Sequence, residues 1–165
     1  MNLGLVETLR YNAWANETLL EACRDLTVLQ LEAALAAGAV GELLVHLVGA
    51  QENYVHMTQG LAHESALTRD SSWPGIDDLI NVSDRTSREL ISLAAELDPK
   101  SDVQLAHHGK VHVYPRRFLL NNVVEHGVRH RTEVVLTLAS IGILVPDLDG
   151  WAYGRFAGYG AEVDA

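Results

Sequence analysis

The sequence has little that could cross-link it, anchor it in a membrane or attract a polyanion. Its single cysteine, Cys23, excludes an internal disulfide and a cysteine-based zinc site. The 12 Lys and Arg residues are outnumbered by 22 Asp and Glu residues, and the resulting formal net charge of −10 argues against nucleic-acid binding. The most apolar segment, Val134–Val145, is shorter than the about 20 apolar residues that span a bilayer. The N-terminus also lacks a signal-peptide pattern, so we expect a soluble, cytoplasmic protein.

What the sequence does contain is helical periodicity. Apolar residues make up 48% of its 165 residues, which is enough for one folded domain, expected to span 1–165. Apolar side chains recur every three or four positions in four long segments. These predicted helices cover about Leu3–Arg24, Glu42–Gln59, Ile76–Leu97 and Arg116–Ile141. Four such segments predict an all-α fold, a four-helix bundle.

Two regions depart from helical periodicity. Val103–Tyr114 is rich in alternating β-branched residues around a possible turn at Gly109, so we expect one short β-hairpin between the third and fourth helices. The tail after Pro146 is rich in glycine and aromatic residues, and we expect it to pack on the bundle as coil.

Eight histidines are the unusual feature of the composition. His126 and His130 are four residues apart on the fourth predicted helix, so both imidazoles leave the same face, one turn apart, and could reach one metal ion. Spacing alone fits a solvated outer face equally well. A second pair, His108 and His112, has the same spacing but straddles the predicted hairpin turn, and we expect it not to bind metal.

Two observations favour the interpretation of His126 and His130 as metal ligands. Its side of the helix is a stripe of mixed polarity: Leu119, Asn122, His126, His130, Glu133 and Thr137. If that stripe is buried, its polar groups must pair or bind a cation. His46, in the most apolar part of the second helix, could supply a third ligand, although a single histidine in such a place is more often a hydrogen-bonded core residue.

Four segments together resemble the DinB/YfiT-like family of metalloenzymes over nearly the whole chain. They are Tyr11–Asn16 in the first helix, Leu44–Leu47 followed by Glu52–Tyr54 in the second, Glu125–Arg131 in the fourth, and Pro146–Tyr153 near the C-terminus. Each is short, but their shared order makes the resemblance specific. The family often carries glutamine where Glu133 stands here.

The resemblance implies a four-helix bundle with a metal site formed by His46, His126 and His130. It implies zinc, nickel or a similar divalent ion, and a homodimer. Three neutral imidazoles leave a coordination position open, as in catalytic sites. Asn53, Asn122 and Glu133 are candidates to orient the ligands or accept a proton.

The resemblance also indicates a reaction class. Relatives in this family include transferases and isomerases that use a low-molecular-weight thiol as cosubstrate, and we expect a small-molecule substrate here. A metal-dependent hydrolase and a non-catalytic metal- or ligand-binding bundle are the alternatives.

Overall fold

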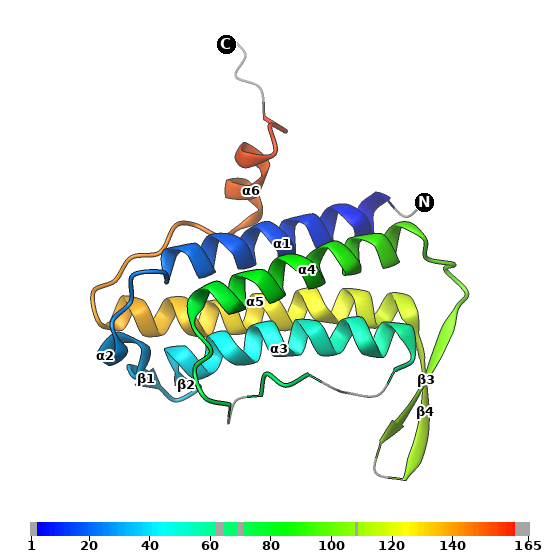
Figure 1. Cartoon of the computed structure of the whole chain (residues 1–165). Helices are drawn as coiled ribbons and strands as arrows, with labels where there is room; N and C mark the ends of the chain where they lie inside the picture. The colour runs from blue at the N-terminus through cyan, green and yellow to red at the C-terminus, as the bar shows by residue number, and fades with distance from the viewer. Residues whose placement is uncertain (1–2, 62–64, 69–70, 108, 161–165) are drawn as a thin grey trace.

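Four long helices form the body of the protein in the computed structural model, which describes residues 3–61, 65–68, 71–107 and 109–160 (Figure 1). They are α1 (Leu3–Ala22), α3 (Val40–Gln59), α4 (Ile76–Ala95) and α5 (Arg116–Ser140). Helices α1 and α3 each pack against both α4 and α5, which closes a ring of four. The expected all-α bundle is confirmed. Among the described helices, none has the length and apolar composition needed to cross a bilayer.

The hairpin expected between the third and fourth long helices is also present. Strands β3 (Asp102–His107) and β4 (Lys110–Pro115) pair antiparallel and extend away from one end of the bundle (Figure 1). Gly60 ends α3 in the left-handed conformation, with φ of 78°. A Cβ at Gly60 would lie only 3.1 Å from Cγ2 of Val103, so the glycine lets β3 lie close to the end of α3.

Two connections differ from the expectation. A second, very small hairpin, β1 (Ala34–Leu35) with β2 (Gly38–Ala39), follows the short helix α2 (Val28–Leu31). The tail is not all coil, because it contains α6 (Gly150–Phe156).

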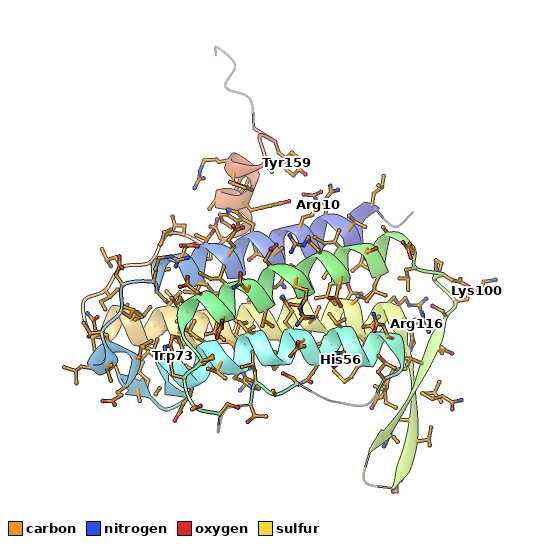
Figure 2. The ribbon with its side chains drawn as sticks, viewed as in Figure 1. Arg10, His56, Trp73, Lys100, Arg116 and Tyr159 are labelled. Atoms are coloured by element: carbon orange, nitrogen blue, oxygen red, sulfur yellow. The ribbon has the colours of Figure 1, made fainter. Side chains whose placement is uncertain are left out.

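Helix α6 forms despite the glycine-rich composition of the tail, because a side-chain cap and contacts with α1 stabilise it. The Asp149 side chain accepts a hydrogen bond of 2.8 Å from the backbone N–H of Ala152 and so caps the first turn. The hydroxyls of Tyr153 and Tyr159 both donate to Glu7 of α1. Figure 2 shows Tyr159 and Arg10, a residue of α1, on the side of the bundle where α6 lies. Contacts with α1 therefore hold a helix that is too short to be stable alone.

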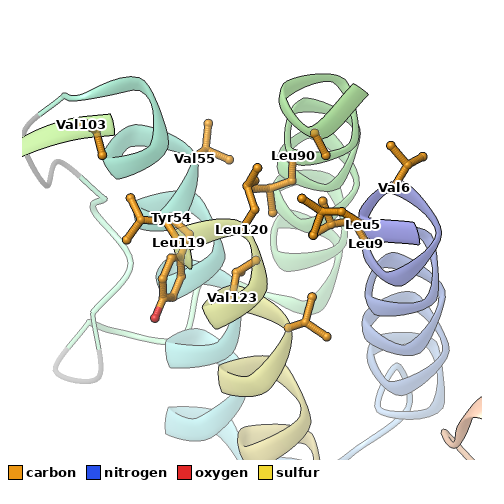
Figure 3. Close-up of a cluster of buried hydrophobic side chains, with 12 residues drawn as sticks. Leu5, Val6, Leu9, Tyr54, Val55, Leu90, Val103, Leu119, Leu120 and Val123 are labelled. Atoms are coloured by element: carbon orange, nitrogen blue, oxygen red, sulfur yellow. The ribbon is translucent and has the colours of Figure 1, made fainter. Parts of the chain in front are cut away.

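The apolar core consists of two clusters. The cluster at the hairpin end contains Leu5 and Leu9 of α1, Tyr54 of α3, Leu90 of α4 and Leu120 of α5, among others (Figure 3). The other end holds a second cluster, which includes Leu19, Leu20, Cys23, Leu43, Leu44, Leu79, Val134 and Leu138. In every long helix a polar segment separates the residues of one cluster from those of the other.

This polar layer is buried halfway along the bundle. Its members are Asn12 and Asn16 of α1, Gln51 of α3, Ser83, Thr86 and Ser87 of α4, and Arg131 of α5. Gln51 accepts hydrogen bonds from Asn12 and Asn16 at 3.2 and 2.8 Å, and its amide donates to groups on α4. The layer ties all four helices together at one level, and this fixes how each helix is rotated about its axis.

Candidate metal centre

Three histidines from two helices meet beside the polar layer. His46 comes from α3, and His126 and His130 from α5; one ring nitrogen of each lies within 4.8 Å of those of the other two. The ring centroids of His126 and His130 are 4.3 Å apart, and the His46 ring is 5.1 and 4.6 Å from them. Ligand nitrogens around a tetrahedral zinc ion lie about 3.3 Å apart, a separation that small side-chain rotations would reach from here. These three residues fit a three-histidine metal site.

Rotation of α5 about its axis brings the histidines to face α3. Arg131, the neighbour of His130, points the other way and is 2% exposed. Its Nη1 donates to the side-chain oxygens of Asn12 at 2.8 Å and Asn16 at 2.6 Å. Gly127 allows this packing, because a Cβ there would lie 2.5 Å from Oδ1 of Asn12. The hydrogen bonds of Arg131 therefore set the direction in which His130 points.

A carboxylate holds the ring of His130. Nδ1 of His130 lies 2.6 Å from Oε2 of Glu133, and Oε1 of the same carboxylate accepts from Arg129 at 3.2 Å. Burial disfavours ionisation of Glu133, but hydrogen bonds from Arg129 and His130 outweigh it and lower the pKa of the carboxyl. The ionised carboxylate favours a proton on Nδ1 of His130. The unprotonated Nε2 is then the ring atom available to bind a metal ion. Histidine ligands of metal ions usually have such a carboxylate partner.

The other two candidates for orienting groups, Asn122 and Asn53, form hydrogen bonds with other partners around the site. Nδ2 of Asn122 donates to the hydroxyl of Tyr54, whose ring centroid is 5.8 Å from that of His126. Oδ1 of Asn53 accepts from the backbone N–H of Ser65 at 3.2 Å. Asn122 therefore acts on the surroundings of His126 through Tyr54, whereas Asn53 holds the connection that follows α3.

A cavity of 240 Å³ opens beside His46. Its walls are His46, Ala50, Asn53, Tyr54 and Met57 of α3, together with Leu67 and Thr68. Burial raises the pKa of the Tyr54 phenol, although the hydrogen bond from Asn122 opposes the shift, so the phenol stays protonated at neutral pH. The cavity gives a small molecule room next to one histidine and within reach of a hydroxyl.

Of the second histidine pair, the structure describes His112. His112 is on β4, where its ring stacks on that of Tyr114 with a centroid distance of 6.2 Å. His108 lies outside the described residues. Among the described residues, the group of metal-ligating side chains that comes together is His46, His126 and His130.

Sequence reasoning missed Tyr54 as a site residue and did not predict the polar layer. The available signal for the layer was a polar residue at the midpoint of each otherwise apolar helix face, such as Asn16, Gln51 and Thr86. Nothing in the spacing of α3 relates Tyr54 to Asn122, because the two residues lie on different helices and are 68 positions apart in the chain.

Comparison with known proteins agrees with this architecture. A crystal structure of a DinB-like protein from Bacillus cereus ATCC 10987 superposes with a TM-score of 0.69 at 16% identity, covering 88% of this chain and 96% of that one. That likeness shows the fold. No curated protein matches the sequence. The sequence model of the DinB family matches residues 1–162, and the chain therefore belongs to the DinB family.

Proposed function

We propose that this protein binds one divalent metal ion through His46, His126 and His130 and that the ion forms a catalytic site. The convergence of three histidine donors from α3 and α5 carries the proposal. Neutral imidazole is a good ligand for zinc and nickel, which are the ions we expect. Three protein ligands are typical of catalytic zinc sites, whereas structural sites generally have four.

We further propose that the reaction is a transfer or isomerisation that uses a low-molecular-weight thiol. A divalent ion in such a site would favour the thiolate form of a thiol near neutral pH. The thiol has to come from outside the chain, because Cys23 is buried in the core and burial raises its pKa to about 12. The cavity beside His46 offers a place for it.

Residues of the chain have distinct tasks in this scheme. Glu133 keeps the His130 ring in one tautomer and one orientation. Tyr54 accepts a hydrogen bond from Asn122, so the phenolic proton can be donated to an oxygen of the substrate that gains charge. Asn122 thereby positions the donor rather than donating to the substrate itself.

Elemental analysis of protein purified without a histidine tag tests the metal site. We expect one equivalent of divalent metal per chain, lost in His126→Ala and in His130→Ala and weakened in His46→Ala. His112→Ala is the matched control and should bind normally, because His112 lies on the hairpin. Equal losses in the control and in the three site variants would contradict the proposal.

Spectroscopy of the cobalt-substituted protein tests the reaction class. We expect one thiol among bacillithiol, mycothiol and glutathione to produce a new sulfur-dependent absorption band, and the same thiol to support turnover of electrophilic substrates. His126→Ala should abolish both. Metal-dependent hydrolysis of simple esters or amides without any thiol would indicate a hydrolase instead. Metal binding with no turnover of either kind would indicate a binding protein.

We also propose that the protein works as a homodimer on a small-molecule substrate in the cytoplasm. The family resemblance supports the assembly. Light scattering coupled to size-exclusion chromatography would measure it directly, and a monomer at micromolar concentration would contradict it.

A further inference from the structure

A second and larger cavity lies where the β3–β4 hairpin meets the bundle. Its volume is 620 Å³, against 240 Å³ for the cavity beside His46. We name it the hairpin cavity; its described walls come from the end of α3, the hairpin and the start of α5: Tyr54, Met57, Gly60, Leu61, Gln104, Leu105, Ala106, His112, Tyr114, Phe118, Leu119 and Asn122. The volume is within the range of about 300–1,000 Å³ that is usual for small-molecule sites.

The register of the hairpin builds one wall. Leu105 pairs with His112 and Val103 with Tyr114, so these four side chains share one face of the two strands. Val103 is 5% exposed and belongs to the bundle core. Farther along the hairpin the same face leaves the core, and Leu105 and His112 line the cavity instead.

The described lining includes four aromatic rings, those of Tyr54, His112, Tyr114 and Phe118, and carries no fixed charge. The rings of His112, Tyr114 and Phe118 form a row, with near-parallel planes 19° and 15° apart and centroids 6.2 and 5.8 Å apart. Phe118 leaves 48% of its surface exposed beside this opening. Neither Lys or Arg nor Asp or Glu lines the described walls, although the whole chain has a net charge of −10. Such a surface favours a flat, uncharged ring system, because a charged group would lose its hydration without meeting a side chain of opposite charge among the described walls.

The hairpin cavity adjoins the three histidines. Tyr54 and Met57 line both this cavity and the smaller one beside His46. The hydrogen-bonded pair of Tyr54 and Asn122 stands at the junction, and the Tyr54 ring is 5.8 Å from that of His126. A molecule lying along the row of aromatic rings can therefore direct one end toward the histidines.

We propose that the hairpin cavity binds the uncharged aromatic part of the substrate and presents its reactive end to Tyr54 and the three histidines. The role of the reactive end rests on the proposed function, whereas binding of the ring system does not. The substrate class is accordingly an uncharged electrophile that carries an aromatic or similarly flat apolar group.

A matched pair of fluorescent probes tests the binding of the ring system without any metal. N-phenylnaphthylamine is neutral, and anilinonaphthalene sulfonate has the same rings with one negative charge. Both are titrated into metal-free protein at high ionic strength, where the long-range repulsion from the net charge is screened. We expect saturable binding of the neutral probe at one site per chain, and binding of the sulfonate that is weaker by about tenfold or more.

Two phenylalanine variants locate the probe. Phe118→Ala should weaken binding of the neutral probe by about tenfold, because it removes one ring of the row. Phe156→Ala is the control, since Phe156 is 69% exposed on α6 and should leave binding unchanged. Melting curves of both variants establish that they fold. Equal affinities in the two variants, equal affinities of the two probes, or no saturable binding would overturn the proposal.

Proton relaxation of the bound probe then tests the junction with the histidines. In cobalt-loaded protein we expect enhanced relaxation relative to zinc-loaded protein, and its absence would overturn the assigned orientation. Failure to bind any metal would refute the proposed function, while saturable binding of the neutral probe to the metal-free protein would still support the aromatic site.

Discussion

Replacing Gly49 by alanine should disturb the segment that closes the cavity beside His46. Gly49 is buried in α3, and a Cβ on it would lie 2.0 Å from the backbone oxygen of Leu67 and 2.9 Å from its Cβ. Ordinary contacts begin near 3.4 Å, so the chain at Leu67 would have to move by about 1.4 Å, the difference between 2.0 and 3.4 Å. The same segment is held to α3 by the 3.2 Å hydrogen bond from Ser65 to Asn53, which the movement would break.

Three contributions set the size of the effect of Gly49→Ala on the free energy of unfolding. Alanine in a helix interior is favoured over glycine by about 1 kcal/mol. Overpacking costs about 1–3 kcal/mol, and a lost hydrogen bond costs about 1 kcal/mol. We therefore expect the variant to be less stable than the parent protein by about 1–3 kcal/mol, with the sign set by the collision.

Urea denaturation followed by circular dichroism measures this difference, and hydrogen exchange of residues 65–68 locates it. Gly41→Ala is the matched control in the same helix, because a Cβ there meets nothing closer than 3.5 Å. We expect that control to be neutral or slightly stabilising. If Gly49→Ala were as stable as Gly41→Ala, with exchange at residues 65–68 unchanged, the close approach of Leu67 to α3 would be wrong.

Three further perturbations test other parts of the structure. Gln51→Leu removes the centre of the polar layer and should lower the free energy of unfolding by about 3 kcal/mol, because buried amides lose their partners; Gln104→Leu, at an exposed position of β3, is the control in the same urea titration. Cys23 should resist a thiol reagent in the native protein and react with one equivalent in denaturant, since burial raises its pKa to about 12; rapid native modification would contradict its burial. Hydrogen bonds from Tyr153 and Tyr159 lower the pKa of Glu7 below its ordinary value of 4.5. The stability that this depressed pKa contributes is present above pH 4.5 and is lost as pH falls through the lowered value, so the difference between the parent protein and Glu7→Gln should shrink in acid; a difference independent of pH would refute it.

Much of the secondary structure could be predicted because it depends on local patterns. Helical periodicity placed the four long helices with ends that differ by a few residues from those observed. Alternating β-branched residues predicted the β3–β4 hairpin. The same reasoning failed for α6, whose glycine-rich sequence has weak helix propensity and whose stability comes from the contact of Tyr153 with Glu7.

The sequence left undetermined what surrounds the stripe of mixed polarity on α5, which carries His126 and His130. Spacing placed His126 and His130 on one face, but it did not say whether that face meets water or protein. In the structure His130 is 3% exposed and Thr137 is 1% exposed, so the stripe is largely inside. Ile141, the last residue of the fourth predicted helix, follows the end of α5 at Ser140 and is 43% exposed.

By itself the sequence determined the four long helices and placed His46 on the second of them and His126 and His130 on the fourth, because hydrogen bonds and side-chain spacing within one helix are local. Only the tertiary structure decided that His46 faces His126 and His130, that Glu133 holds the ring of His130, and that a hairpin forms one wall of a cavity beside them. These features depend on the rotation of each helix about its axis. That rotation is fixed by contacts between residues far apart in the chain, such as Arg131 with Asn12, which no local pattern encodes.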